Sequence, residues 1–272
     1  MTNLSEKNIL ITGGSAGIGL AMAQEFARRG AQLALVARNL DALKQAQTAL
    51  EKNGAKVAVY SADVTDAEGL GRVMAEARDA MGGLDGVVAN SGYCLPGYFH
   101  EITPEDARRQ VDTNLMGCMN TLHHAIPMLL EKGGGFVAIT SSPAGNAGIF
   151  GFSVYGATKA ALNYLSHVLR AEYGDQGIRV HLLLPPDTQT PGYDKEVTLY
   201  PKETQAILSG GSLYSAEAVG RKFVDGIEKN RRSVTVGWEA PLLLRILRYT
   251  PWLWEAYTRR IIRKSQAHTR KE

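Results

Sequence analysis

A tyrosine and a lysine one helical turn apart are the residues of this chain best suited to proton transfer. Tyr155 and Lys159 are four positions apart, and on a helix this spacing places both side chains on one face. A phenol with its ordinary pKa of about 10 is a weak proton donor at neutral pH. A lysine cation roughly 5 Å away, at an effective dielectric of about 20, favours the phenolate by about 3 kcal/mol, or about two pKa units. We therefore expect Lys159 to bring the pKa of Tyr155 towards neutrality, where a general acid works best.

A serine hydroxyl can join this pair at a bound carbonyl. Ser142 comes shortly after the apolar run from Phe136 to Ile139, which predicts a buried strand. At the carboxyl end of that strand, its hydroxyl could meet Tyr155 over a substrate carbonyl. A tyrosine and a lysine at this spacing also occur by chance or on a solvated helix face, so the interpretation depends on the remaining chain.

A glycine-rich turn near the amino terminus predicts an anion-binding site. The apolar run Asn8 to Thr12 predicts a strand, and a helical pattern follows the Gly-x-x-x-Gly-x-Gly sequence of residues 13–19. Backbone amides at such a junction, together with the helix dipole, bind phosphate groups. We expect the phosphate groups of a bound cofactor to contact this turn, at Gly13, Ser15, Ala16, Gly17, Ile18 and Gly19.

The same turn permits a second interpretation, because residues 13–17 also have the Gly-x-Ser-x-Gly spacing of a hydrolase nucleophile elbow. That chemistry needs an acid and a histidine at later strand ends. His123, His124 and His167 fall in helical patterns. His181 lies within a strand-like run, so no histidine has an obvious place in a catalytic triad.

The end of the second predicted strand indicates which dinucleotide is bound. The run of residues 32–37 ends in Arg38, where a fold that binds NAD usually has a carboxylate for the ribose 2′-hydroxyl. An arginine accommodates a 2′-phosphate instead. With Ser15 as a second donor, Arg38 predicts NADPH/NADP as the cofactor; a solvated loop arginine is the alternative.

Strand-like and helical patterns alternate from residue 8 to about residue 237. Regular alternation predicts parallel strands joined by right-handed crossovers, with ligands bound beyond the carboxyl ends of the strands. We expect an α/β fold, a single-domain Rossmann-type doubly wound parallel sheet of about seven strands with helices on both faces. The domain would span residues 1–238, with a substrate lid at about residues 191–213 and a basic, aromatic-rich tail at residues 239–272.

Composition and charge exclude several classes of protein. The chain has 272 residues, and its 44% hydrophobic and 21% charged content is ordinary for a folded domain. Cys94 and Cys118 provide neither a disulfide framework nor metal-ligand spacing, so no metal is expected. The short polar amino terminus predicts no signal peptide, and no apolar run is long enough to predict a membrane span. These features indicate a cytoplasmic protein.

Basic charge is concentrated in the tail. Residues 240–272 contain eight Lys/Arg against two Glu, a net charge of +6, whereas the whole chain carries +3. Tryptophan and leucine interleaved with basic residues are typical of a helix in a membrane interface, which predicts peripheral contact with the cytoplasmic membrane face. Packing on the domain itself or on a partner subunit is the alternative. Because the excess charge does not spread over the domain, no nucleic acid partner is expected.

Taken together, these motifs resemble those of the short-chain dehydrogenase/reductase family. The resemblance covers about residues 5–237 and is carried, in this order, by Thr12-Gly13-x3-Gly17-x-Gly19, Asn90-x-Gly92, Asn114, Ser142 and Tyr155-x3-Lys159. One departure is that the family's Asn-Asn-Ala-Gly stands here as Ala89-Asn-Ser-Gly92, without the first asparagine.

The resemblance implies a role for each of these residues. Ser142 would hydrogen-bond the substrate carbonyl, and Tyr155 would donate the proton. Lys159 would hold the nicotinamide ribose and tune Tyr155, and Asn114 would anchor a water relay. The remaining cofactor contacts it implies are Asp63 and Val64 at the adenine, Asn90 and Gly92 on the adenosine ribose side, and Pro185, Thr188 and Thr190 at the nicotinamide.

Within the family, several segments are similar to the branch of 3-ketodihydrosphingosine reductases. These segments are residues 13–17, 36–39, 148–152, 185–192 and 202–204. This resemblance implies NADPH-dependent reduction of 3-ketosphinganine, a long-chain ketone lipid, to sphinganine in sphingolipid biosynthesis, by a homodimer or homotetramer. The alternatives are a reductase of another lipophilic ketone, ketoacyl or steroid-like, and a non-catalytic NADPH-binding regulator. The apolar lid residues could line the lipid cleft or merely pack the lid on the domain.

Overall fold

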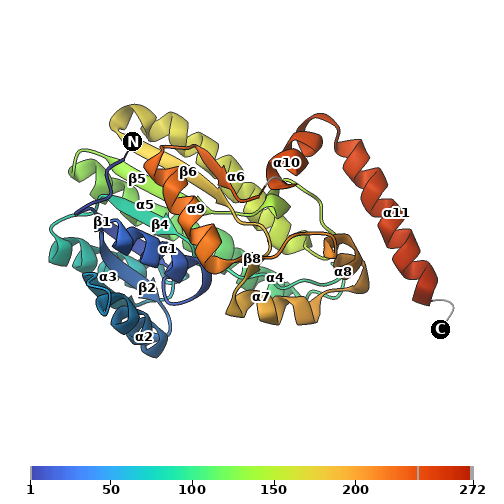
Figure 1. Ribbon diagram of the computed structural model, residues 1–272, viewed down its shortest axis with the longest axis horizontal. Helices are drawn as coiled ribbons and strands as arrows, with labels where there is room; N and C mark the ends of the chain where they lie inside the picture. The colour runs from blue at the N-terminus through green and yellow to red at the C-terminus, as the bar shows by residue number, and fades with distance from the viewer. Residues whose placement is uncertain (1, 238, 270–272) are drawn as a thin grey trace.

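The computed structural model describes residues 2–237 and 239–269 and contains a central sheet of seven parallel strands. Their order across the sheet is β3-β2-β1-β4-β5-β6-β9 (Figure 1). This confirms the expected doubly wound α/β fold. The strands are β1 Asn8–Thr12, β2 Gln32–Ala37, β3 Val57–Ser61, β4 Gly86–Ala89, β5 Gly135–Thr140, β6 Ile178–Leu184 and β9 Ser233–Thr235.

The strands are apolar on both faces because helices cover both sides of the sheet. All five residues of β1 are buried. Ile9 and Ile11 belong to one hydrophobic cluster, whereas Leu10 belongs to the cluster on the opposite face. This alternation follows from the two-residue period of a strand.

Three helices form each of the two outer layers. The layer that packs with Ile9 and Ile11 consists of α1 Gly17–Arg28, α2 Leu40–Glu51 and α9 Ala216–Glu228. The layer that packs with Leu10 consists of α3 Ala67–Met81, α5 Gly117–Glu131 and α6 Ser153–Tyr173. The sequence predicts one helix over residues 104–132. The structure instead has α4 Pro104–Val111, a π-helical turn Asp112–Met116 and then α5, without a break in the helical run.

The predicted lid contains two short helices, α7 Pro191–Glu196 and α8 Lys202–Leu208, joined through a 3₁₀ turn Val197–Leu199. A small parallel pair, β7 Thr188–Gln189 and β8 Tyr214–Ser215, ties the two ends of this segment together. The lid therefore leaves and rejoins the domain at neighbouring positions.

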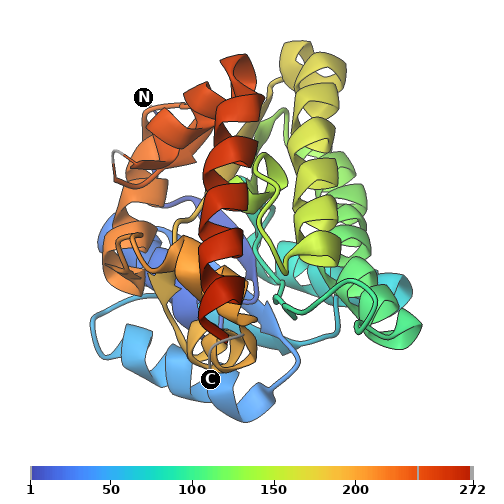
Figure 2. The ribbon, with the colours of Figure 1, turned by 90° about the vertical axis from the view of Figure 1, so that its right-hand side faces the viewer.

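The tail forms two helices, α10 Glu239–Tyr249 and α11 Pro251–Thr269, at the end of the molecule that carries the lid (Figures 1 and 2). Helix α11 contacts α8. Gln266 donates a hydrogen bond to Glu203 at 3.1 Å, and the Trp254 indole donates one to the Gly148 carbonyl at 3.2 Å. The tail thus packs partly on its own domain. Within the described residues, no helix has the length and apolar character needed to cross a membrane.

Candidate active site

Four adjacent strands deliver most of the predicted site residues to one edge of the sheet. The neighbours β1, β4, β5 and β6 end next to the glycine-rich turn, Asn90, Ser142 and Pro185, respectively. Ligands of doubly wound sheets bind at this carboxyl edge, close to the point where the strand order reverses. In this sheet that point lies between β1 and β4.

Tyr155 and Lys159 lie together on α6, as their spacing predicts. The Lys159 ammonium nitrogen is 5.6 Å from the centre of the Tyr155 ring. It donates a hydrogen bond to the Thr140 carbonyl oxygen at 2.9 Å, and the lysine is only 3% exposed. The last residue of β5 therefore fixes the position of the cation beside the phenol.

The expectation that the pKa of Tyr155 lies near neutrality is wrong for this structure. Burial raises the pKa of Tyr155 above its ordinary value, because the phenolate would lose its hydration. The Cys94, Glu196 and Asp187 side chains raise it further. A hydrogen bond with Ser142 lowers the pKa of Tyr155 but does not offset these effects. Tyr155 is therefore a neutral phenol that holds a proton available for donation.

Ser142 is placed at the carboxyl end of β5, as predicted. Its hydroxyl accepts a hydrogen bond from the Ala144 amide at 3.1 Å and also bonds Tyr155. The neighbouring Ser141 has a different role, because its hydroxyl bonds the Lys159 carbonyl and, at 2.6 Å, the Asn163 side chain. Of the two serines, Ser142 shares the site with the phenol, and Ser141 joins β5 to α6.

Asn114 lies in the π-helical turn and is fully buried. Its side chain accepts a hydrogen bond from the Tyr93 amide at 2.9 Å and donates one to the Tyr93 carbonyl at 2.8 Å. It thereby holds the loop that follows β4. A Cβ atom on Gly92 would lie 3.0 Å from the Asn114 side-chain oxygen and 3.4 Å from the Lys159 ammonium, so this loop passes close to both.

Asn90 connects the loop after β4 to two neighbouring strands. Its backbone amide donates to the Thr12 hydroxyl at 3.1 Å, and its side chain donates to the Gly13 carbonyl at 3.4 Å. Its side-chain oxygen accepts from Thr140 at 3.1 Å. The side chain of Asn90 therefore supports the glycine-rich turn as well as the end of β5.

The glycine-rich turn fits a dinucleotide phosphate. A Cβ atom on Gly19 would lie 2.1 Å from the Gly13 carbonyl oxygen, so the turn closes only around a bare backbone. Helix α1 begins after Ala16, which offers no side-chain cap. The amino termini of α2, α3 and α4, by contrast, are capped by the side chains of Asn39, Asp66 and Thr103. The first amides of α1 are therefore available to an anion.

The predicted adenine and nicotinamide residues flank this turn. Arg38 pairs with Asp63 at 3.8 Å, and its side chain is 76% exposed. Val64 is buried, and a Cβ atom on Gly117 would lie only 2.5 Å from its side chain. On the other side, the Thr190 methyl group lies 3.1 Å from where a Cβ atom on Gly17 would be. Thr188 is buried and bonds the Pro186 carbonyl within the loop that follows Pro185.

Sequence reasoning missed three side chains of this site. The Cys94 thiol hydrogen-bonds the Glu196 carboxyl, which also accepts a hydrogen bond from the Tyr200 hydroxyl at 2.8 Å. Asp187 raises the pKa of both Glu196 and Tyr155. Glu196 stands on the lid, far from Tyr155 in sequence, and no motif signals it. Asp187 lies inside the predicted nicotinamide loop, where an acid between Pro186 and Thr188 was a usable signal.

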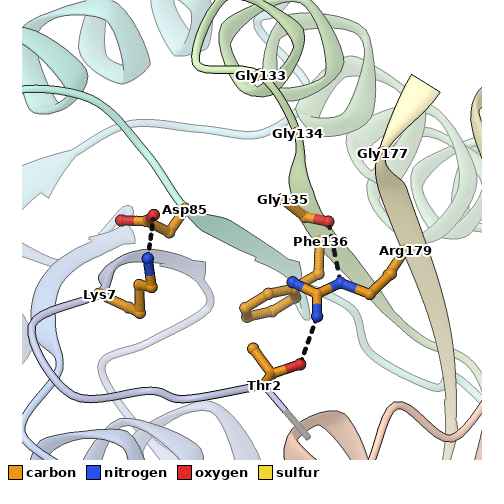
Figure 3. Close-up of a pocket in the computed structure, with 9 residues that line it drawn as sticks. All are labelled: Thr2, Lys7, Asp85, Gly133, Gly134, Gly135, Phe136, Gly177 and Arg179. Atoms are coloured by element: carbon orange, nitrogen blue, oxygen red, sulfur yellow. Dashed lines mark hydrogen bonds and ion pairs between the residues drawn. The ribbon is translucent and has the colours of Figure 1, made fainter.

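A pocket of about 270 Å³ lies at the opposite, amino-terminal edge of the sheet (Figure 3). Its charged groups have protein partners: Lys7 pairs with Asp85 at 3.1 Å, and Arg179 bonds the Thr2 hydroxyl at 2.6 Å. Lys132 also pairs with Asp85. These contacts connect the first residues of the chain to the sheet. None of the residues that line this pocket is a predicted site residue.

Comparison with known proteins identifies the family of this chain. A family model described as short chain dehydrogenase matches residues 7–198. The chain belongs to this family. As a short-chain dehydrogenase, it is an oxidoreductase that uses a nicotinamide dinucleotide to interconvert a carbonyl and an alcohol.

Relatives of known name cover most of the chain. It is 33% identical over 233 residues to a 3-dehydrosphinganine reductase of Arabidopsis thaliana, covering 84% of this chain and 69% of that protein. It is 34% identical over 232 residues to the 3-ketodihydrosphingosine reductase of Bos taurus, covering 83% and 70%. Among solved structures, levodione reductase superposes with a TM-score of 0.80 at 25% identity, over 87% of this chain and 98% of that chain.

We predict that carbonyl reduction by this protein declines as the pH rises through about 8. Burial lowers the pKa of Lys159 to about 8, so the ammonium beside Tyr155 loses its proton above that pH. The raised pKa keeps the phenol itself neutral throughout this range. The measurement is kcat against pH between 6 and 10 at saturating cofactor. A rate that stays constant to pH 10 would contradict the prediction.

Proposed function

We propose that this protein reduces 3-ketosphinganine to sphinganine with NADPH, a step of sphingolipid biosynthesis. The observation that carries the proposal is the Tyr155, Ser142 and Lys159 cluster beneath an aromatic lid. The Phe152 ring lies 5.7 Å from Tyr155 and 5.7 Å from the lid residue Tyr200, centre to centre. The 3-ketosphinganine reductase activity named for the Arabidopsis and Bos taurus relatives is consistent with this site.

The proposed reaction divides between cofactor and side chains. When bound, NADPH supplies the hydride that reduces the C3 carbonyl carbon, and it leaves as NADP⁺. Ser142 and Tyr155 orient the carbonyl oxygen and stabilise its developing negative charge. Tyr155 gives its proton to that oxygen, and the Lys159 ammonium stabilises the resulting phenolate. Asn114 anchors the proton relay that restores the phenol.

The proposal includes a role for each residue of the predicted cofactor site. Gly13, Ser15, Ala16 and the first turn of α1 would hold the phosphates, and Pro185, Thr188 and Thr190 would contact the nicotinamide. Asp63 and Val64 would contact the adenine, and Asn90 and Gly92 would contact the adenosine ribose. We infer that residues 1–238 are one domain with a lid at residues 191–213. We also infer a homodimer or homotetramer built on the long helices near residues 104–132 and 153–174, where Met116 and Met119 are exposed.

The choice of NADPH over NADH rests on Arg38. Its exposed guanidinium stands at the carboxyl end of β2, where the 2′-position of the adenosine ribose is expected. Asp63, its partner at 3.8 Å, also accepts hydrogen bonds from the Thr65 amide and hydroxyl. The long ion pair leaves the guanidinium free to turn towards a phosphate.

The Tyr155→Phe variant tests the proposed acid. Reduction of 3-ketosphinganine should fall by at least about 100-fold, the usual contribution of a positioned general acid, while NADPH binding stays within about twofold. NADPH oxidation and fluorescence titration of bound NADPH measure the two effects. Tyr164→Phe, on the exposed side of the same helix, is the matched control and should retain full activity. Substantial activity in Tyr155→Phe would overturn the assignment.

The Arg38→Ala variant tests the phosphate contact. We expect the Michaelis constant for NADPH to rise by about tenfold or more, as for loss of a charge-assisted hydrogen bond, and that for NADH to change little. Arg72→Ala removes another exposed arginine, one that pairs with Glu68 on α3, and should leave both constants unchanged. Equal effects of Arg38→Ala on the two cofactors would refute the contact.

We further propose that the tail attaches the protein to an anionic membrane surface. Tyr249, Trp252 and Tyr257 are 72%, 62% and 55% exposed, and Leu253 is 44% exposed. Exposed basic side chains accompany them on the same two helices: Arg245, Arg259, Arg260, Arg263 and Lys264. Large apolar groups mixed with cations favour the lipid interface. The contacts of Trp254 and Gln266 with the domain leave these exposed groups uncovered.

Co-sedimentation with vesicles tests the attachment. The chain should bind phosphatidylglycerol vesicles and bind phosphatidylcholine vesicles much more weakly. An anionic surface contributes about 1 kcal/mol of binding free energy per basic residue, and phosphatidylcholine does not. The double variant Trp252→Ala, Leu253→Ala should reduce binding by at least about tenfold, because it removes two apolar anchors. Phe99→Ala removes an exposed aromatic group outside the tail and is the control. Equal binding by all three proteins would rule out attachment through the tail.

A further inference from the structure

Within the part of the chain that the structure describes, two carboxylates of the active site have no basic partner. None of the ion pairs within the described residues includes Glu196 or Asp187. The hydrogen-bond donors to Glu196 are the Tyr200 hydroxyl, at 2.8 Å, and the Cys94 thiol, both uncharged. In the described chain, Asp187 accepts a hydrogen bond only at its backbone carbonyl, from the Tyr214 amide at 2.9 Å.

The surroundings of these carboxylates place them at the reacting end of the site. Glu196 holds Tyr200, whose ring packs against Phe152, and Phe152 in turn contacts the Tyr155 ring. Cys94, the other partner of Glu196, is close enough to Tyr155 and Lys159 to alter the pKa of both. Asp187 comes from the loop after β6, on the nicotinamide side. The lid and the loop thus supply one carboxylate each.

Partial burial without a cation is costly for both groups. Burial raises the pKa of Glu196 and of Asp187, and the charge of Asp187 raises the pKa of Glu196 further. An unpaired carboxylate in a desolvated site is stabilised strongly by any cation that enters it. Within the described residues no ion pair supplies that cation, and the Lys159 ammonium donates its hydrogen bond to the Thr140 carbonyl instead.

We propose that Glu196 and Asp187 bind the ammonium group that the substrate carries on the carbon next to its ketone. This inference rests on the proposed function. In 3-ketosphinganine the amine is on C2 and the ketone is C3, so a carbonyl held by Ser142 and Tyr155 brings the amine close to the same two carboxylates. The pair therefore selects 2-amino-3-keto lipids over ketones that lack the amine, such as ketoacyl or steroid-like compounds.

The same contact links recognition to proton donation. Without substrate, the two carboxylates oppose the formation of a phenolate at Tyr155. A bound ammonium compensates their charge, so the phenol gives up its proton more readily when an amino-ketone occupies the site. With a ketone that lacks the amine, the two carboxylates continue to disfavour the Tyr155 phenolate.

Two substrates and two isosteric variants test the proposal. The substrates are 3-ketosphinganine and the same hydroxy-ketone with hydrogen in place of the amine. For the amino-ketone, Glu196→Gln and Asp187→Asn should each lower kcat/KM by about tenfold or more, the size expected when one partner of a buried charge pair is lost. For the amine-free ketone, kcat/KM should stay within about twofold or increase. Asp194→Asn, which removes one charge from an exposed site on the same helix α7, should affect neither.

The outcomes separate this proposal from the proposed function. Equal losses of kcat/KM on both substrates in Glu196→Gln and Asp187→Asn would overturn the ammonium contact. They would not contradict the proposed function, reduction of 3-ketosphinganine by the wild-type protein. A wild-type protein that reduces neither ketone would overturn both proposals. A wild-type protein that reduces the two equally well would also overturn the contact, because the carboxylates would then give no preference.

Direct binding supplies a readout that does not depend on turnover. Sphinganine should raise the melting temperature of the wild-type protein, and its N-acetyl derivative should do so much less, because acetylation removes the charge. In Glu196→Gln the difference between the two ligands should shrink. The melting temperature of the variant without ligand also shows whether it is folded. An unchanged difference in a folded variant would count against Glu196 as the ammonium partner.

Discussion

The site depends on one buried cation and the carbonyl that holds it. The Lys159 ammonium bonds the Thr140 carbonyl at 2.9 Å and thereby joins helix α6 to the end of β5. A charge this deeply buried needs partners and space. Gly92 leaves room beside it, and Asn114 keeps the Gly92 loop in place by holding both backbone groups of Tyr93. Tyr155 stands on the same helix as Lys159, and Ser142 follows the strand that Thr140 ends, so the bond between Lys159 and Thr140 joins the two elements that carry them.

The sheet and the reacting pair could be predicted because their signals are local. The period of apolar residues predicts the strands, and a four-residue spacing on one helix places Tyr155 above Lys159. The phosphate-binding turn could be predicted because its glycines all lie within residues 13–19. The ends of strands are less well determined: the sequence predicts strands over residues 56–61 and 233–237, whereas the structure has them at Val57–Ser61 and Ser233–Thr235.

What could not be predicted arises from contacts between distant parts of the chain. The pKa of Tyr155 depends on its burial and on acidic side chains that the lid and the loop after β6 bring over it, so the lysine alone gave the wrong direction. The π-helical turn at Asn114 has no sequence signal, and the hydrogen bonds of its side chain join it to Tyr93, which precedes it by 21 residues. Asn90 is similar, since its side chain contacts the Gly13 and Thr140 segments, which only the folded sheet places beside it.

The two halves of the lid differ in how firmly they are held. Helix α8 buries Glu203, which bonds both the Tyr98 hydroxyl and Gln266, and Thr204, which bonds the Phe150 carbonyl. Helix α7 and the turn after it bury no residue. Moving α7 away from the domain therefore exposes less buried surface than moving α8, which is docked against α11. Because Glu196 stands on α7, its position over the phenol depends on the less firmly held half of the lid.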